Sequence, residues 1–210
     1  MAESRVGILG ATSMVGQSLV PLLRDAGHHV IAYSRSRQKH QPADSIEFRC
    51  YPASGETGDE TIADWICLAP IWTFPEHFAM LSGHRVKRVV ALSSTSIFSK
   101  RHSADKAEQN MAAQLARGEG ELISWAEANG IEWVILRPTL IYGLGKDRNI
   151  CEIARFIARF GFFPLFGKAE GLRQPVHVED VAAACMAALQ HTKVRNRSYE
   201  ISGAEIMPYR

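Results

Sequence analysis

A glycine-containing segment near the N-terminus, RVGILGATSMVG over residues 5–16, has residue types suited to binding a phosphate group. Its apolar run predicts a strand, and the apolar spacing that follows predicts a helix. Free N–H groups and the dipole at such a helix N-terminus can hold a pyrophosphate. Gly10 permits the turn, Gly16 lets the helix approach the strand, and Ser13 stands where a middle glycine is expected. A dinucleotide site is therefore predicted, with a purely structural turn as the alternative.

Basic residues follow the second predicted strand, at 29–33. The next residues are Ser34, Arg35, Ser36 and Arg37, where an NAD-binding sheet usually places Asp or Glu against the ribose hydroxyls. Guanidinium groups present paired donors to phosphate oxygens, so this loop favours NADP over NAD. A solvated basic loop is the alternative.

Hydroxyl groups gather after the strand predicted at 86–93. Ser93, Ser94 and Ser96 come shortly after Leu92, at the carboxyl end of a central strand, where α/β sheets bind their ligands. A hydroxyl in this place can polarise a substrate oxygen by donating a hydrogen bond. The cluster predicts that a substrate meets the cofactor here.

Short apolar strands alternate with longer helical patterns, which is typical of a parallel sheet with helical crossovers. Strands are predicted at 5–9, 29–33, 46–50, 64–69, 86–93, 131–137, 174–178 and 198–202, and helices at 14–26, 74–82, 105–129, 149–160 and 179–190. The expected fold class is α/β, a Rossmann-type doubly wound parallel sheet with a small C-terminal substrate-binding part. Residues 1–138 would form the dinucleotide-binding part, and residues 139–210 the smaller part, interleaved with the same domain.

Composition narrows the classes of partner. The chain has 210 residues, a formal net charge of +2, 46% hydrophobic and 22% charged residues, as in ordinary globular proteins. Basic residues occur in small groups such as Arg85, Lys87 and Arg88, so nucleic acid is not an expected partner. The four cysteines lack C-x-x-C spacing and the N-terminus lacks a leader pattern, which favours a cytoplasmic protein. No metal site is expected, because His177 and Asp180 lack a third ligand.

Four motifs occur in order along nearly the whole chain: the glycine turn, the serine cluster, LRPTLIYG at 136–143 and PVHVEDVA at 175–182. With them the chain resembles the extended and atypical short-chain dehydrogenase/reductase superfamily, and above all its NAD-dependent epimerase/dehydratase group. The resemblance implies catalysis by a strand-end Ser or Thr, a Tyr, and a Lys four residues after the Tyr. Ser94 matches the hydroxyl position and Ser96 a frequent helper.

The Tyr and Lys of that pattern are missing from this chain. The helix predicted at 105–129 has no tyrosine, and an alignment on Glu121 places Ala113 and Arg117 at the Tyr and Lys positions. Arg117 can hydrogen-bond a ribose or phosphate but cannot exchange protons. Tyr142 and His102 are the candidate replacements, with a cleft-shaping tyrosine and a solvated loop histidine as the alternatives.

The predicted contacts come from the strand ends and the loops that follow them. For the cofactor they are Gly10, Thr12, Ser13, Met14, Val15, Gly16, Ser34, Arg35, Ala69, Pro70, Leu92, Ser93, Arg117, Pro138 and Thr139. For the substrate they are Ser94, Tyr142, Arg173 and Gln174.

An aromatic segment at 150–166 contains five of the nine phenylalanines, with Arg155 and Arg159 four residues apart. Its apolar residues follow helical spacing, so a core-facing helix is one interpretation. The alternatives are a pocket for an apolar substrate, contact with a partner subunit, and contact with a membrane surface.

Two functions follow as hypotheses. The first is an NADP-dependent oxidoreductase or epimerase that acts on a nucleotide-linked sugar or a related carbonyl compound. The second is a non-catalytic NADP-binding sensor or assembly factor. A homodimer formed through the helices near 74–82 and 105–129 is a further expectation from the resemblance.

Overall fold

The computed structural model describes residues 4–34, 45–51, 60–162 and 172–208. Its main sheet has seven strands, all parallel, in the order β10-β6-β5-β4-β1-β2-β3. The strands are β1 (Arg5–Leu9), β2 (His29–Ser34), β3 (Ile46–Cys50), β4 (Asp64–Cys67), β5 (Arg88–Leu92), β6 (Glu132–Pro138) and β10 (Arg197–Ile201). The winding direction reverses between β1 and β4, and the carboxyl ends of such a pair form the ligand crevice of doubly wound sheets. The predicted fold class is confirmed.

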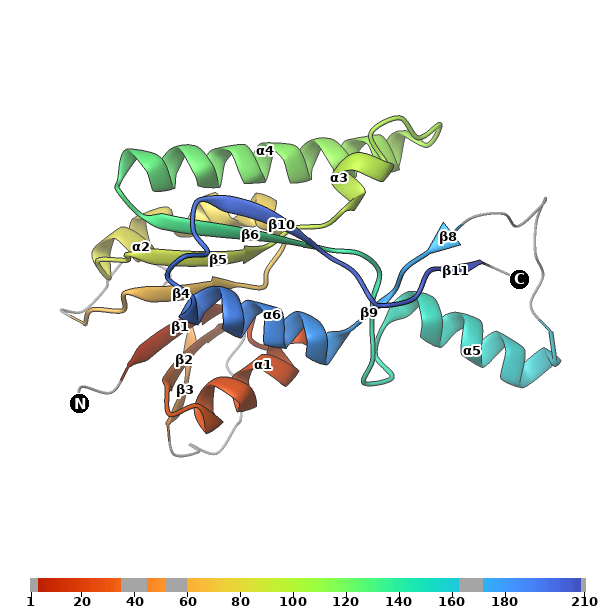
Figure 1. Cartoon of the computed structure of the whole chain (residues 1–210), viewed down its shortest axis with the longest axis horizontal. Coiled ribbons are helices and arrows are strands. Elements are labelled where there is room, and N and C mark those ends of the chain that lie inside the picture. Colours follow the sequence, from red (N-terminus) through yellow and green to blue (C-terminus); the bar gives the residue numbers. More distant parts are fainter. Residues whose placement is uncertain (1–3, 35–44, 52–59, 163–171, 209–210) are drawn as a thin grey trace.

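Helices cover both faces of this sheet (Figure 1). One face carries α1 (Met14–Asp25) and α6 (Val178–Gln190), which pack against each other. The other carries α4 (Lys106–Ala128), together with a 3₁₀ helix, η1 (Ile71–His77), and the short α2 (Phe78–Gly83). The central strands are apolar throughout because successive side chains point to opposite faces. In β4, for example, Ile66 joins the core under α1 and α6, whereas Trp65 and Cys67 join the core under α4.

A smaller group of elements lies beyond the carboxyl ends of the main strands (Figure 1). It contains β7 (Ile141–Tyr142), which pairs with β9 (Val176–His177), and β8 (Leu172–Arg173), which pairs with β11 (Met207–Pro208). The helix α5 (Arg148–Phe160) belongs to the same end, and the short α3 (Ser96–Ser99) follows β5. From residue 139 onward the chain also returns to the main layers, through α6 and β10.

Several predicted boundaries change in the structure. The helix predicted at 74–82 is a 3₁₀ helix followed by α2, and Pro75 within η1 lacks the N–H that an α-helix would use. The strand predicted at 174–178 shrinks to Val176–His177 and pairs with β7, because Pro175 has no N–H for a ladder. Gly27 follows α1 and Gly130 follows α4, and both have positive φ values, 84° and 65°, the conformation in which glycine commonly ends a helix.

Candidate functional site

The glycine turn lies between the end of β1 and the start of α1. Gly10 has φ +83°, and a Cβ added to it would lie 2.8 Å from the Ala69 backbone nitrogen, just after β4. A Cβ added to Gly16 would lie 2.2 Å from the Ala11 carbonyl oxygen. The two glycines therefore let the backbone of β1, β4 and α1 come together at the crevice.

Ser13 is the N-cap of α1. Its Oγ accepts a hydrogen bond of 3.1 Å from the Gly16 N–H, and its own N–H donates to the Gly10 carbonyl at 3.0 Å. These two hydrogen bonds stabilise the tight turn at the position where a middle glycine was expected. The N–H groups of Met14 and Val15 belong to the first helical turn, so they have no acceptor within the helix. They are suited to hold an anion.

A lysine that sequence reasoning missed reaches the first turn of α1. Lys146 follows β7, in a loop where Leu144 and Gly145 have positive φ values of 53° and 62°. Its Nζ donates to Oε1 of Gln17 at 2.5 Å, and Nε2 of Gln17 donates to the Thr12 carbonyl at 3.2 Å. An ammonium group thus stands beside the glycine turn, in a first turn that has no acidic residue. No local pattern in the sequence indicated this contact, which joins residues 129 positions apart.

The serine cluster links the ends of β5 and β6. Ser94 Oγ donates to Ser96 Oγ at 3.1 Å and accepts from the Ser96 N–H at 3.1 Å. The Ser93 N–H donates to the Leu136 carbonyl, and the Thr95 N–H to the Pro138 carbonyl. Ser93 Oγ is buried and has no hydrogen-bond partner among the described residues. Two hydroxyls and an uncommitted third therefore sit at the carboxyl end of a central strand.

Thr139 and Gln174 join this edge to the smaller part. Thr139 Oγ1 donates to the Gln174 carbonyl at 2.5 Å, and the Thr139 N–H donates to the Ile201 carbonyl at 2.9 Å. Gln174 Nε2 in turn donates to the Gly203 carbonyl at 2.7 Å. The Gln174 side chain is thus used in holding two loops together.

The face that α4 turns toward the sheet differs from the one expected. Its buried residues are Ala112, Leu115, Gly118, Glu119, Leu122 and Ala126. Arg117 projects from the opposite side, with 66% of its side chain exposed, and lies 3.6 Å from Glu121. Ala113 is exposed as well. The structure therefore does not turn the predicted pair toward the sheet.

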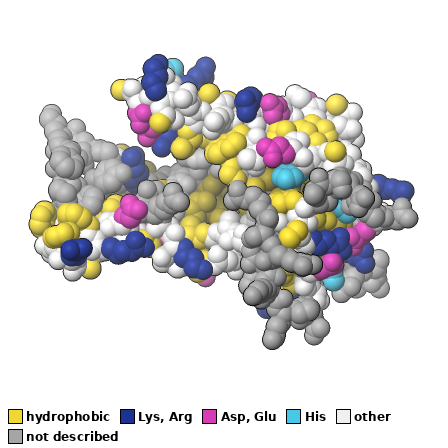
Figure 2. All heavy atoms as spheres, turned by 180° about the vertical axis from the view of Figure 1, so that it is seen from behind, with side chains coloured by type: hydrophobic (Ala, Val, Ile, Leu, Met, Phe, Trp, Pro, Cys, Tyr) yellow, Lys and Arg dark blue, Asp and Glu magenta, His cyan; other side chains and the backbone are white. Residues whose placement is uncertain are grey.

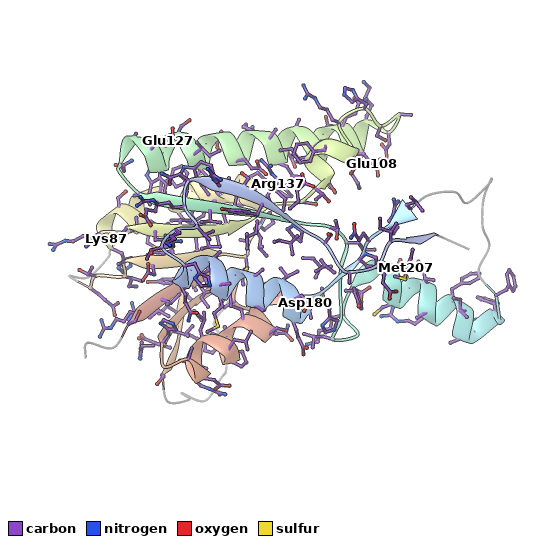
Figure 3. All side chains as sticks on the ribbon, viewed as in Figure 1. Lys87, Glu108, Glu127, Arg137, Asp180 and Met207 are labelled. Carbon is purple, nitrogen blue, oxygen red and sulfur yellow. The ribbon has the colours of Figure 1, made fainter. Side chains whose placement is uncertain are left out.

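The carboxylate that does face the sheet is Glu119, only 4% exposed. Both of its oxygens accept hydrogen bonds from Arg137 at the end of β6, one of them at 2.9 Å. This carboxylate raises the pKa of Arg137, and the guanidinium carbon lies 5.1 Å from the centre of the Phe98 ring in α3. Glu119 and Arg137 thus tie α4 to β6, the strand that follows it, and Arg137 lies between this helix and α3 (Figure 3).

The two proposed proton donors lie in different surroundings. Tyr142 is half-buried, and its ring packs edge-on against His177 with 5.1 Å between the ring centres. His102 is exposed in the turn after α3. Among the described residues, neither side chain forms a hydrogen bond with Ser94, whose Oγ bonds to Ser96.

A hollow lies beyond the carboxyl ends of the main strands, and Glu108 at the start of α4 belongs to the end that carries α3. Figure 2 shows this hollow between the end that carries α3 and the end that carries α5, with hydrophobic side chains inside it. Glu108 accepts from Ser103 Oγ at 2.7 Å and pairs with Lys100 at 3.0 Å. Ser103, Lys100 and the more distant charge of Arg173 all lower the pKa of Glu108. The rim of the hollow therefore carries paired charges.

Three more residues predicted to bind the cofactor are Leu92, Ser34 and Arg35. Leu92 is buried in the core, and Ser34 ends β2 with 5% exposure. Arg35 lies outside the described residues.

Burial raises the pKa of the Cys67 and Cys185 thiols to about 12. Within the described ranges, no three His, Cys, Asp or Glu side chains converge as metal ligands, and no helix is long and apolar enough to cross a membrane.

Comparison with known protein families shows which family this chain belongs to. The model of the NAD dependent epimerase/dehydratase family matches residues 78–202. The chain belongs to this family. The match includes the serine cluster, α4 and the β6–β7 segment. Relatives in the epimerase/dehydratase family bind NAD(P).

Two curated relatives match only part of the chain. NADH dehydrogenase (ubiquinone) 1 alpha subcomplex subunit 9, mitochondrial, of Arabidopsis thaliana is 32% identical over 105 residues, which are 50% of this chain and 25% of the relative. UDP-glucose 4-epimerase of Vibrio cholerae is 25% identical over 95 residues, 45% of this chain and 29% of the relative. The chain therefore matches between a quarter and a third of the length of these relatives.

Solved epimerase/dehydratase structures share the fold over most of their length. UDP-N-acetylglucosamine 4-epimerase from Bacillus cereus has a TM-score of 0.75 at 17% identity, over 99% of this chain and 80% of that chain. MoeE5 in complex with UDP-glucuronic acid and NAD has a TM-score of 0.73 at 21% identity, over 97% and 78%. At these identities the likeness establishes the fold.

Proposed function

We propose that this chain binds NADP(H) at the carboxyl edge of its sheet and acts as an oxidoreductase or epimerase on a nucleotide-linked sugar or a related carbonyl compound. One observation carries the proposal. The cradle at Gly10 and Gly16 and the hydroxyl pair of Ser94 and Ser96 lie at the same edge of one parallel sheet. The fit to a dinucleotide rests on this cradle, which a Cβ would fill, and on the unpaired Ser93 hydroxyl. Fluorescence titration with NADPH and NADH tests cofactor binding, and turnover by the Ser94→Ala variant tests the reaction.

The chain's residues would divide the work by position. The N–H groups of Met14 and Val15 would hold the pyrophosphate, and Pro138 and Thr139 would border the nicotinamide. Ser94 would donate a hydrogen bond to the substrate oxygen, oriented by its bond to Ser96. The bound cofactor would supply hydride chemistry. The UDP-sugar enzymes among the similar structures support a nucleotide-linked sugar as the substrate class.

The loop after β2 would select NADP(H). No acid stands at Ser34 or the three residues after it, and Arg35 would pair with the 2′-phosphate. Fluorescence titration is expected to show NADPH binding about tenfold more tightly than NADH. Arg35→Ala should remove that preference by weakening NADPH alone, whereas Arg24→Ala at the far end of α1 should not. Tighter binding of NADH by the unaltered chain would contradict the choice of NADP.

Lys146 would add a charge to the pyrophosphate site, since its ammonium group lies beside Gln17 in the first turn of α1. Lys146→Met is expected to weaken NADPH binding about fivefold, the scale of one exposed ion pair. The effect should shrink as salt is added. Lys87→Met, at the opposite end of the sheet (Figure 3), is the matched control. Equal affinities for the two variants would remove Lys146 from the site.

Under this proposal, the alignment of α4 with the family's Tyr and Lys positions also changes. Glu119 is the carboxylate bound to the end of β6, and we take it, rather than Glu121, as the acidic residue that follows the family's Lys. The Tyr and Lys positions then move by two residues, to Met111 and Leu115. Leu115 is buried, whereas Met111, one turn before it on the same side of α4, is 42% exposed. Neither side chain can exchange a proton.

This absence favours a second candidate, a non-catalytic NADP-binding sensor or assembly factor. The NADH dehydrogenase subunit among the curated relatives is consistent with a role in an assembly. The two candidates differ in one measurement, the oxidation of NADPH in the presence of nucleotide-linked keto sugars. An enzyme should turn over, and Ser94→Ala should slow it about 10- to 100-fold by removing one hydrogen bond to a developing charge.

The control for that experiment is Ser99→Ala, which removes a hydroxyl at the end of α3, beyond the Ser94–Ser96 pair. NADPH affinity should be the same in both variants. Tight NADPH binding without turnover of any keto sugar would favour the non-catalytic candidate. Turnover that is indifferent to Ser94→Ala would remove that residue from the mechanism.

A further inference from the structure

The helix α5 stands apart from the sheet, at the end of the molecule where the main strands stop (Figure 1). It packs only sparsely against the other described elements. Large apolar side chains are exposed on it nevertheless. Ile157 is 44% exposed, Phe160 is 52% exposed, and Phe162, just beyond the helix, is 60% exposed. Phe156 packs against both phenylalanine rings, with 4.6 Å and 6.0 Å between ring centres. An aromatic face thus meets solvent.

The two arginines of α5 lie outside this aromatic face. At 100° per residue, the residues Ile153, Phe156, Ile157 and Phe160 fall in one sector of about 100°. Arg155 falls nearly opposite that sector, and Arg159 falls beside it, about 60° from Phe156. Glu152 is the one acid among the described side chains of α5. The guanidinium carbon of Arg159 lies 5.3 Å from the centre of the Phe160 ring, so a positive charge lies next to the exposed aromatic face. Figure 2 shows hydrophobic and basic side chains together on this end.

We propose that α5 lies flat on an anionic lipid bilayer, with Phe156, Ile157 and Phe160 in the acyl boundary and the arginines at the headgroups. An interfacial helix needs an apolar face and a basic polar face. The 13 residues of α5 are too few to span a bilayer. Two arginines against one acid favour lipid phosphates over a neutral surface, and arginine stems can extend beside an apolar face with the charge in water.

A bilayer bound to α5 would lie at the same end of the molecule as the crevice. Because α5, β8 and β11 all lie beyond the carboxyl ends of the main strands (Figure 1), a bilayer under α5 would lie close to the mouth of the hollow. The lipid contact itself needs neither cofactor nor turnover, so it stands or falls separately from the proposed function.

Flotation of the full chain on a sucrose gradient tests this. One set of vesicles is phosphatidylcholine alone, and the other contains about one quarter phosphatidylglycerol. The chain is expected to float with the anionic vesicles and to stay at the bottom with the neutral ones. Ile157→Gln with Phe160→Gln should lower the vesicle-bound fraction about tenfold or more. Arg155→Gln and Arg159→Gln should each lower it about fivefold.

Matched substitutions on α1, Leu22→Gln with Arg24→Gln, should leave flotation unchanged, since they alter one apolar and one basic residue on another helix. Thermal melting followed by circular dichroism confirms that each variant is folded. Absence of flotation with anionic vesicles overturns the proposal, as does flotation that the α5 substitutions do not change. Light scattering that shows a dimer lost in the Ile157→Gln and Phe160→Gln variant, with no vesicle binding by the unaltered chain, would assign this face to a second copy.

Discussion

A Gly16→Ala variant should lose NADPH binding by at least about 100-fold, or about 2.7 kcal/mol. The added methyl group would lie 2.2 Å from the Ala11 carbonyl oxygen and 2.8 Å from the Ala11 Cα, and both belong to the backbone. Backbone cannot rotate away as a side chain can, so α1 must move off the turn. That movement displaces the N–H groups of Met14 and Val15 from the pyrophosphate, and displacements on this scale have large effects on binding geometry.

Gly120→Ala is the matched control for this variant. Gly120 is also within a helix, but nothing lies within 4 Å of its Cβ position. This substitution should leave NADPH affinity unchanged and raise stability by about 0.5 to 1 kcal/mol, because alanine has less freedom to lose on folding. Isothermal titration measures the affinity, and a thermal melt measures stability. Unaltered NADPH affinity in Gly16→Ala would mean that the turn is purely structural.

Arg88→Met should destabilise the fold by about 3 to 5 kcal/mol, the largest stability effect we expect. The Arg88 side chain is 7% exposed and pairs with Glu132 of β6. Its Nη2 also donates to the carbonyls of Ala188, His191 and Val194, at 2.7, 2.9 and 2.6 Å. These carbonyls end α6 and begin the turn toward β10. Methionine would leave the Ala188 and Val194 carbonyls without this donor and would remove one of the two arginines that bind Glu132, and unmet buried acceptors are expensive.

The melting temperature should fall by roughly 10 °C in Arg88→Met. Arg195→Met is the control, because Arg195 binds the other oxygen of Glu132 but is 62% exposed. Its loss should change stability by less than about 1 kcal/mol. Circular dichroism melts of the two variants compare them directly. A similar melting temperature for both would show that burial adds nothing to the Arg88 interactions.

The order and type of most elements could be predicted from local patterns. Continuous apolar runs such as 89–92 belong to strands covered on both faces, which is why they predict a parallel sheet. The glycine turn was predictable for a similar reason, because its strand, turn and helix are adjacent in the chain. The Ser94 and Ser96 hydroxyls follow a strand directly, so their place at the carboxyl edge needed no long-range contact.

The rotation of α4 could not be predicted in the same way. Acidic residues stand at both Glu119 and Glu121, and two residues along a helix correspond to about 200° of rotation. Only packing shows that Glu119 faces Arg137 while Arg117 faces solvent. The burial of Arg88 was equally unpredictable. In the sequence it is one of three nearby basic residues, with Arg85 and Lys87, and only the structure shows that it is buried.

The sequence by itself therefore determined the parallel sheet, the helices between its strands and the edge at which the glycine turn and the serines meet. These depend on periodicity and on neighbours within about one βαβ unit. Tertiary structure alone decided which face of α4 looks inward, that Lys146 reaches α1 from 129 residues away, and that the aromatic face of α5 meets solvent. Each of these depends on contacts between distant segments, whose geometry no local pattern contains.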